Sequence, residues 1–311
     1  WVPISLGDLF YAFLILVIIF RTYRFFRLLI RKKLNRSYFV LAIQQVIFFF
    51  LFVYVFFNLL WGLNYNRNGI SRQLGIEVRK YSLSDLDTLT AALQKKLNVY
   101  AALATDEQRD SITRKRDLFR ESSLAYEHAA KKYSFLGYRP VSVKPSLFSY
   151  AGNYLGFQGY YNPFSGEAQV NTTIPRFLEP FVTCHEIAHQ IGYGKENEAN
   201  FVAFLACRDY PSSAFRYSLY FDVYNYAANE VFKRDTALFR VFFQKLHPLV
   251  ISDILELRRF YNKYENPVEP LITWSYGHFL KANNQPAGKQ TYNEVVPWLI
   301  AYYKKFGIDA L

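Results

Sequence analysis

Two histidines and a glutamate stand in the pattern His-Glu-x-x-His, as His185, Glu186 and His189. Residues four apart lie on one face of a helix, so the two histidines can direct imidazole nitrogens at a single metal ion. Glu186 can then reach a water molecule on that ion and act as a general base. The pattern therefore predicts a zinc-dependent hydrolytic site in which Glu186 is the catalytic residue and Zn²⁺ is the cofactor.

The residues around this pattern favour a helix that is buried in a domain core. Apart from Glu186 the stretch 181–191 carries no Asp, Glu, Lys or Arg and is mostly apolar, and Gly192 follows where a glycine commonly ends a helix. The alternative interpretation is a core helix whose two histidines are merely hydrogen-bonded. A third ligand close to the two histidines would favour the metal site over the hydrogen-bonded core helix.

A catalytic zinc ion needs three protein ligands and one open position. Glu196 and Glu198 follow the turn at 192–194 and compete for the third place. The helical face through Glu196 carries small side chains, which would let this helix approach the first one closely. These small residues are Ala199, Ala203 and Cys207. We expect Glu196 to be the ligand, with Glu198 as the alternate and Asn200 as a hydrogen-bonding partner that orients a ligand.

The order Glu196, Ala199, Asn200 resembles the third-ligand helix of the thermolysin-like, or gluzincin, peptidases. The separation is shorter than in those families, because Glu196 follows His189 by only seven positions. Gly192, three residues after His189, is instead similar to the glycine of metzincins, whose third histidine would fall at Lys195. A lysine cannot take that place.

Two apolar stretches at the start of the chain predict transmembrane helices. Residues 2–20 contain one charged residue, Asp8, and residues 38–63 contain none. Either stretch is long enough to cross a bilayer about 30 Å thick. A pair of buried core helices is the alternative.

The basic character of the chain is local. Its formal net charge is +12, and seven basic residues fall between the two apolar stretches, in 21–36, with no acidic residue among them. Short basic loops stay in the cytoplasm, so we expect everything after Tyr65 to face outside or into the periplasm. Such a loop meets anionic lipid rather than nucleic acid. The expected partners are thus the lipid bilayer and an extracytoplasmic peptide or protein substrate, without nucleic acid.

The sequence predicts an α+β fold that is mostly α, in three parts. Residues 1–65 form the transmembrane hairpin, 66–136 a helical hairpin, and 137–311 a zincin-like domain that resembles gluzincins and has a small antiparallel sheet. Within 66–136, a capping box at Ser82–Asp85 opens a helix that runs to about residue 103. Thr105–Glu107 opens a second helix, to about residue 133.

The segment before the His-Glu-x-x-His helix reads as a hairpin of short strands around an Asn-Pro and Ser-Gly turn. In zinc peptidases the strand just before that helix commonly pairs with the substrate backbone. An ordinary hairpin without a ligand is the alternative. The residues of the candidate substrate edge strand are Glu167, Ala168, Gln169, Val170 and Asn171.

Hydrolysis also needs a group that stabilises the oxyanion. The candidates are Tyr217, Tyr226, Tyr276 and His278. The two cysteines, Cys184 and Cys207, could form a disulfide outside the cytoplasm, but free buried thiols at a helix contact are the more common arrangement.

Four segments together resemble a bacterial membrane family known as domain of unknown function 3810. They are Trp61–Arg67, Tyr160–Thr172, Cys184–Cys207 and Phe279–Asn284. The resemblance implies an integral membrane protein with a His-Glu-x-x-His site and a further transmembrane helix before Trp1. It implies no substrate.

Two functions compete with zinc-dependent hydrolysis: a non-catalytic, zinc-binding or partner-binding membrane scaffold of the same fold, and a structural zinc site. A scaffold should have lost Glu186 or a ligand, and neither is lost. A structural site needs a fourth protein ligand, for which only Cys184 or Glu198 lies nearby. The sequence therefore favours a membrane-anchored zinc peptidase.

Overall fold

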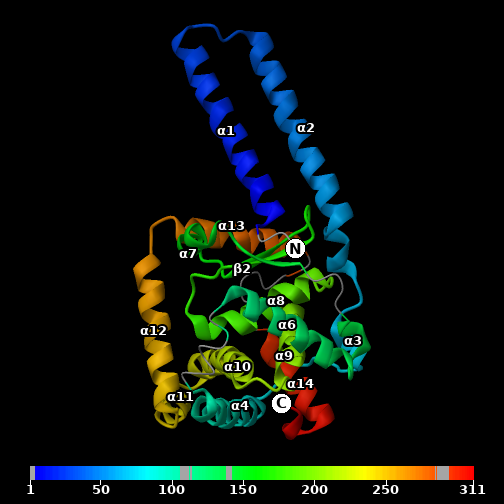
Figure 1. Cartoon of the computed structure of the whole chain (residues 1–311), viewed down its shortest axis with the longest axis vertical. Coiled ribbons are helices and arrows are strands. Elements are labelled where there is room, and N and C mark those ends of the chain that lie inside the picture. Colours follow the sequence, from blue (N-terminus) through cyan, green and yellow to red (C-terminus); the bar gives the residue numbers. More distant parts are fainter. Residues whose placement is uncertain (1–3, 106–111, 113, 138–141, 284, 286–293) are drawn as a thin grey trace.

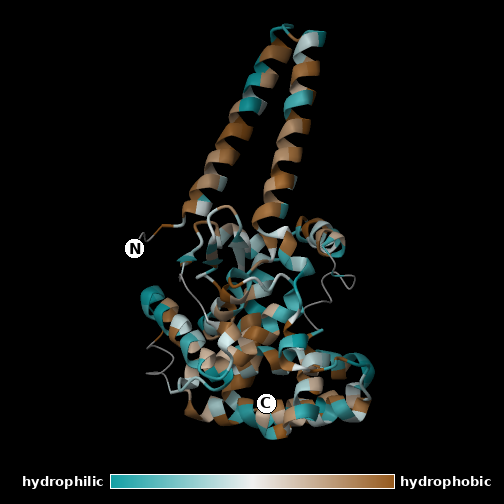
Figure 2. Cartoon of the chain, turned by 90° about the vertical axis from the view of Figure 1, so that its right-hand side faces the viewer, coloured by the Kyte–Doolittle hydropathy of each residue, from teal (hydrophilic) through white to brown (hydrophobic). Residues whose placement is uncertain are grey.

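A long helical hairpin projects from one end of the molecule in the computed structural model (Figure 1). Its helices are α1 (Leu6–Ile30) and α2 (Arg36–Leu60). The structure describes residues 4–105, 112, 114–137, 142–283, 285 and 294–311. Within these ranges α2 is the one helix long and apolar enough to span a membrane, with a mean hydropathy of 2.4 in its most apolar window and none of that window buried. Figure 2 shows apolar residues along both helices of the hairpin.

The prediction that residues 21–36 form a loop is wrong, because most of this segment is helical. Helix α1 continues to Ile30, and only Arg31–Asn35 connects it to α2. Residues 21–30 contain no Gly or Pro, and their arginines are good helix formers. The basic side chains therefore extend from the far end of α1 as well as from the connection.

The body below the hairpin is built mainly of helices around one hydrophobic core. Helices α8 and α9 pack against each other at its centre, with α10 and α6 beside them, and α10 packs on α4. The remaining helices cover the core from outside (Figure 1). The helices of the body are α3 (Ile70–Leu74), α4 (Leu83–Leu103), α6 (Lys115–Ala130), α7 (Ser149–Leu155), α8 (Glu179–Gln190), α9 (Glu196–Arg208), α10 (Ser213–Arg234), α11 (Thr236–Gln244), α12 (Pro248–Tyr264), α13 (Glu269–Ala282) and α14 (Val295–Phe306). Short 3₁₀ turns occupy Gly62–Asn66, Ser134–Leu136, Arg176–Leu178 and Ile308–Ala310.

The sheet has three strands in the order β1-β3-β2, and it is mixed. Strand β2 (Gly159–Asn162) pairs antiparallel with β3 (Glu167–Val170), as the hairpin pattern predicts. Strand β1 (Val143–Pro145) pairs parallel with the other side of β3. The expectation of a purely antiparallel sheet is wrong, because β1 reaches β3 through a connection that includes α7 and β2.

The first turn of α1 is anchored on this sheet by a buried carboxylate. Glu167 of β3 accepts hydrogen bonds from the hydroxyl of Ser5 at 2.9 Å and from the backbone N–H groups of Leu6 and Gly7 at 3.2 and 2.8 Å. Burial alone would raise the pKa of Glu167, but these hydrogen bonds outweigh it and lower the pKa below its usual value. A carboxylate at a helix N-terminus satisfies the free N–H groups and complements the helix dipole.

A second carboxylate, Asp8, fixes α1 from the opposite direction. It is fully buried, and its oxygens accept hydrogen bonds from the backbone N–H of Leu147 at 2.6 Å and from the hydroxyl of Tyr160. Leu147 precedes α7, and Tyr160 lies on β2. The foot of the hairpin is thus joined to the sheet and to α7 by charge-assisted hydrogen bonds.

The capping box is confirmed: Ser82 caps α4, and Asp85 returns the hydrogen bond to the Ser82 backbone. The predicted start of the second helix at Thr105–Glu107 extends beyond the described residues, and α6 begins at Lys115. These two helices do not form the expected hairpin, since α4 packs mainly on α10 whereas α6 packs on α8 and α9. Residues 66–136 therefore share the core of the following segment.

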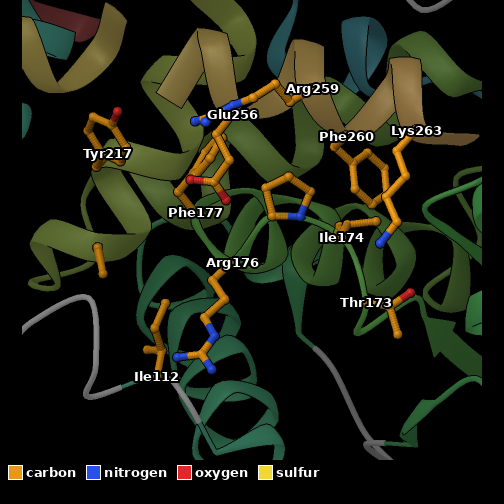
Figure 3. A pocket seen from close by; sticks show the side chains of 12 residues that line it. Ile112, Thr173, Ile174, Arg176, Phe177, Tyr217, Glu256, Arg259, Phe260 and Lys263 are labelled. Carbon is orange, nitrogen blue, oxygen red and sulfur yellow. The ribbon is translucent and has the colours of Figure 1, made fainter. Parts of the chain in front are cut away.

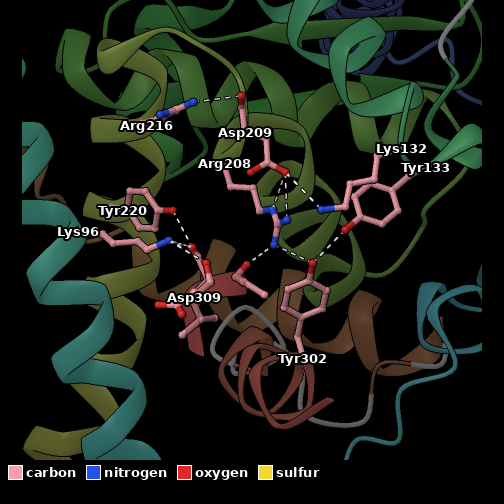
Figure 4. Close-up of polar contacts among 11 residues, drawn as sticks. Lys96, Lys132, Tyr133, Arg208, Asp209, Arg216, Tyr220, Tyr302 and Asp309 are labelled. Carbon is pink, nitrogen blue, oxygen red and sulfur yellow. Dashed lines mark hydrogen bonds and ion pairs between the residues drawn. The ribbon is translucent and has the colours of Figure 1, made fainter. Parts of the chain in front are cut away.

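A buried arginine joins α9 to the end of the chain. Arg208 donates to the hydroxyl of Tyr302 at 2.7 Å and to the carbonyl of Ala310, and it pairs with Asp209 at 3.0 Å (Figure 4). The Tyr302 hydroxyl also bonds that of Tyr133 at 2.9 Å. The Asp209 side chain is 47% exposed, so that ion pair contributes little and the bonds to buried acceptors matter more.

We predict that Arg208→Leu lowers the free energy of unfolding by about 2–3 kcal/mol, because it leaves buried acceptors without a charged donor. The melting temperature in detergent should fall by about 5 °C or more. Arg240→Leu, on the exposed surface of α11, is the matched control and should change it little. Equal melting temperatures for the two variants would contradict this role.

Candidate metal centre

The candidate centre lies where the end of α8 meets the start of α9. The turn between them, 191–195, is tight because Gly192 adopts φ +96°, which other residues disfavour. A Cβ at this position would also lie 2.7 Å from a guanidinium nitrogen of Arg67. That guanidinium donates to the Ile191 carbonyl at 2.9 Å and stacks on Tyr193. The turn therefore sets the two helices at a fixed separation.

Three side chains from the two helices converge on one point. The Nε2 atoms of His185 and His189 lie 3.1 Å apart, and an oxygen of Glu196 lies 3.1 and 3.4 Å from them. All three residues are buried. Together they form a group that could hold a metal ion.

Hydrogen bonds at the far side of each imidazole fix which nitrogen faces this point. His185 Nδ1 lies 2.7 Å from the side-chain oxygen of Asn200, and His189 Nδ1 lies 2.7 Å from the carbonyl of Tyr193. These oxygens only accept, so the proton of each neutral imidazole sits on Nδ1. Both Nε2 lone pairs then face the Glu196 carboxylate. Three electron-pair donors at such distances repel one another unless a proton or a metal cation lies between them, so the donor set fits a cation.

The charges around this point are strongly coupled. Burial alone lowers the pKa of His189, but the Glu196 carboxylate more than offsets it and raises that pKa to about 9. Burial alone would raise the pKa of Glu196. The two histidines outweigh this effect and lower the pKa of the Glu196 carboxyl. Glu196 is therefore anionic, as a metal ligand must be.

Glu196, and not Glu198, belongs to this cluster. Glu198 is also buried, but its carboxylate lies against Gly69, where a Cβ added to the glycine would come within 2.3 Å of it. Burial raises the pKa of Glu198. The second oxygen of Glu196 accepts a hydrogen bond from the hydroxyl of Tyr276 at 2.9 Å, which fixes the orientation of the carboxylate.

Glu186 lies beside the cluster with one oxygen unengaged. Its Oε2 is buried and has no hydrogen-bond partner among the described residues. Burial raises the pKa of Glu186 to about 7. Its other oxygen lies against β2, where a Cβ on Gly159 would come within 2.6 Å. A carboxyl group that titrates near neutral pH and has a free oxygen can exchange a proton with a water molecule or a substrate.

The structure separates the four oxyanion candidates. Tyr276 bonds the cluster directly, and Tyr226 lines the same cavity as His185 and Glu186. Tyr217 points elsewhere: it donates to Asp253 at 2.5 Å and lines another cavity of about 730 Å³ (Figure 3). The ring of His278 bonds the Trp274 carbonyl at 2.9 Å on the exposed side of α13. Tyr217 and His278 are therefore wrong as candidates.

The predicted substrate edge, Glu167–Asn171, is also wrong. Strand β3 lies in the middle of the sheet with a neighbour on each side, and all of it is buried. Its backbone has no free edge to offer, and Glu167 anchors α1. The strand that lies at the sheet edge and against Glu186 is β2.

Cys184 and Cys207 are free, buried thiols and do not form a disulfide. Burial raises the pKa of Cys207, and the neighbouring Cys184 raises it further. They pack where α8 meets α9.

A large cavity of about 900 Å³ opens beside His185 and Glu186. Its walls come from α7, β2, α8, α9, α10, α12 and α13, and also from α1 of the hairpin. No sequence pattern indicated the contribution of α1. Another residue that sequence reasoning missed is Asp222 of α10, which lines this cavity. One of its oxygens is buried without a partner among the described residues, and burial raises its pKa to about 8.

Residues 1–300 of the chain match the family described as "Protein of unknown function (DUF3810)". The chain belongs to this family. No curated protein and no solved structure matches the DUF3810 chain. The function of its site therefore has to be argued from the site itself.

We predict that Asp222 makes the stability of the protein fall as the pH rises. The unfolded carboxyl ionises near pKa 3.8, whereas the folded one stays protonated until about pH 8. Folding therefore takes up a proton between these values, and stability declines through that window. Asp222→Asn should remove this decline, so that its melting temperature at pH 8.5 exceeds that of wild type by at least about 3 °C.

The control is Asp87→Asn, on the exposed surface of α4, which should keep the wild-type pH dependence. Melting curves of all three proteins at pH 5 and pH 8.5 make the comparison. Parallel behaviour of Asp222→Asn and wild type would contradict the prediction.

Proposed function

We propose that this chain is a membrane-anchored, zinc-dependent peptidase that hydrolyses peptide bonds of extracytoplasmic proteins or peptides. The observation that carries the proposal is the unengaged oxygen of Glu186 beside the His185, His189 and Glu196 cluster. Two imidazoles and a carboxylate form a three-ligand set that zinc uses in catalytic sites, where a fourth position stays open. The cavity beside His185 gives a substrate access to that position.

A zinc ion held there would supply Lewis acidity, which makes water a usable nucleophile near neutral pH. Glu186 then accepts a proton from the attacking water and returns it to the departing amine. The raised pKa of Glu186 suits both transfers, since the group must bind and release a proton at the same pH. Tyr226 lines the cavity on the side of Asn200 and is our candidate for stabilising the carbonyl oxygen. Tyr276 holds the Glu196 carboxylate.

Strand β2 is our candidate for binding the substrate backbone. It is the outer strand of the described sheet, and its Gly159 lies against Glu186. An extended peptide that adds to this edge would carry its carbonyl groups past the general base. The absence of a side chain at Gly159 leaves room for Glu186.

The membrane part of the proposal rests on the hairpin. We propose that α1 and α2 both cross the bilayer, with the basic segment 21–36 on the cytoplasmic side and the body outside, in the periplasm where a cell has one. Trp61 follows directly after α2, and its ring centroid lies 6.1 Å from that of His189. The centre would therefore lie close to the membrane surface. Nothing in the site favours the scaffold alternative, because the general base and all three ligands are present.

We predict that zinc co-purifies with the full chain at close to one equivalent and that chelation abolishes hydrolysis of a peptide library. Glu186→Gln should keep the zinc yet lower kcat by at least about 100-fold, because it removes a base and not a ligand. Metal content and turnover are measured on the same preparations. Glu127→Gln, on the exposed surface of α6, is the control for a carboxylate-to-amide change. Undiminished turnover in Glu186→Gln would refute the role of the base.

We further predict that Glu196→Ala weakens zinc binding far more than Glu198→Ala. Loss of a direct ligand should cost at least the 10- to 100-fold that indirect partners typically contribute, whereas Glu198 points away from the cluster. Competition titrations with a chromogenic chelator give both affinities. The reverse order would move the third ligand to Glu198.

A further inference from the structure

The cavity beside the metal centre is shared between the catalytic helices and the membrane hairpin. His185 and Glu186 of α8 form part of its wall, and Tyr11, Leu14 and Ile15 of α1 form another part. In α1 these residues lie one to two turns beyond Asp8, where the helix leaves the sheet. The cavity is therefore bounded by the centre and by the first turns of a helix that we place in the bilayer.

Most of the rest of the lining is apolar. It includes Phe148, Leu155, Phe157, Phe181, Phe260 and Ile272. A polar segment that packed against these side chains would lose hydration that they cannot replace, whereas an apolar one gains free energy. The occupant that this cavity favours is apolar.

Helix α13 extends the wall of the cavity to the foot of the hairpin. This helix lies at the foot of the hairpin (Figure 1), where its Phe279 packs on Phe57 of α2 with ring centroids 6.0 Å apart. Ile272 lines the cavity, whereas the neighbouring Leu271 and Trp274 are 63% and 62% exposed. Exposed tryptophan and leucine side chains beside a membrane helix are typical of the interfacial region.

We propose, building on the peptidase function above, that the substrates are membrane-anchored polypeptides, and that the cavity holds the apolar segment next to their membrane anchor. A polypeptide fits better than a free acyl chain, because the wall includes Gly159 and Tyr160 of the edge strand β2. Backbone groups at a sheet edge need hydrogen-bond partners, which a peptide provides and a hydrocarbon does not. Cleavage then falls close to the membrane surface.

The experiment uses the zinc-loaded full chain in phosphatidylcholine vesicles with three fluorogenic peptides that share one cleavable core. The first is soluble, the second continues through an apolar stretch into a transmembrane anchor, and the third carries an N-terminal palmitoyl group. The anchored polypeptide should have a kcat/KM at least tenfold above the other two.

Two substitutions test the cavity itself. Ile15→Trp fills it from α1, whereas Leu16→Trp places the same side chain on a neighbouring position that does not line it and is 64% exposed. Ile15→Trp should lower the ratio of kcat/KM for anchored over soluble peptide about tenfold, and Leu16→Trp should keep the wild-type ratio. Equal cleavage of all three peptides, or preference for the palmitoyl peptide, would overturn the proposal while leaving a peptidase.

A binding measurement separates this outcome from failure of the peptidase function. The Glu186→Gln chain in the same vesicles is photo-crosslinked to an anchored peptide with a diazirine in its apolar stretch. Crosslinks to α7 or α13 that decline about tenfold when Ile15→Trp is added, but not when Leu16→Trp is added, support the cavity assignment even if no peptide is cleaved. Crosslinking that neither substitution changes would overturn it.

Discussion

The mutual repulsion of three electron-pair donors is the constraint on which the rest of the structure depends. His185, His189 and Glu196 meet in a buried place, where a proton or a metal ion must lie between them. Bringing them there costs solvation of a carboxylate, which the two histidines offset, and the packing of α8 on α9 holds the three groups together. The close turn at Gly192 and the small residues on α9 allow that packing.

The groups around the donors serve to keep them in that arrangement. Asn200 and the Tyr193 carbonyl select the tautomers of the two histidines, and Tyr276 holds the outer oxygen of Glu196. Tyr276 comes from α13 and Asn200 from α9 itself. The centre thus depends on a helix that also lies at the foot of the α1–α2 hairpin, which links the integrity of the site to the way the body meets the hairpin.

Local patterns made the centre of the site predictable. The spacing of His185 and His189 is that of one helical turn, and the small residues after Glu196 indicated which carboxylate could come close. The capping box at Ser82 likewise placed the start of α4. The resemblance in four segments led to the family to which the chain belongs.

What the sequence did not reveal depends on contacts between distant segments. The parallel pairing of β1 with β3 involves only three residues on each strand and leaves no periodic pattern, so the sequence predicts β3 as an edge strand. The sequence names Tyr276 as a candidate but does not separate it from Tyr217 and Tyr226, because its contact with Glu196 joins segments 80 residues apart. A lone Asp222 on an amphipathic helix reads as a surface residue, and only the fold shows that it shares a cavity with residues of α12 and α13. The basic residues of 21–30 favour a loop, whereas their helix propensity favours the continuation of α1 that the structure has.

The two carboxylates at the foot of α1 have a geometric consequence. Glu167 of β3 bonds the N-terminus of α1, and Asp8 of α1 bonds Leu147, just before α7, and Tyr160 of β2. Helix α1 therefore cannot rotate or slide without breaking buried, charged hydrogen bonds. In a bilayer the hairpin would therefore fix the height of β2 and of Glu186 above the lipid. The distance of a peptide bond from the membrane, rather than the residues that flank it, would then select which bond of an anchored chain is cleaved.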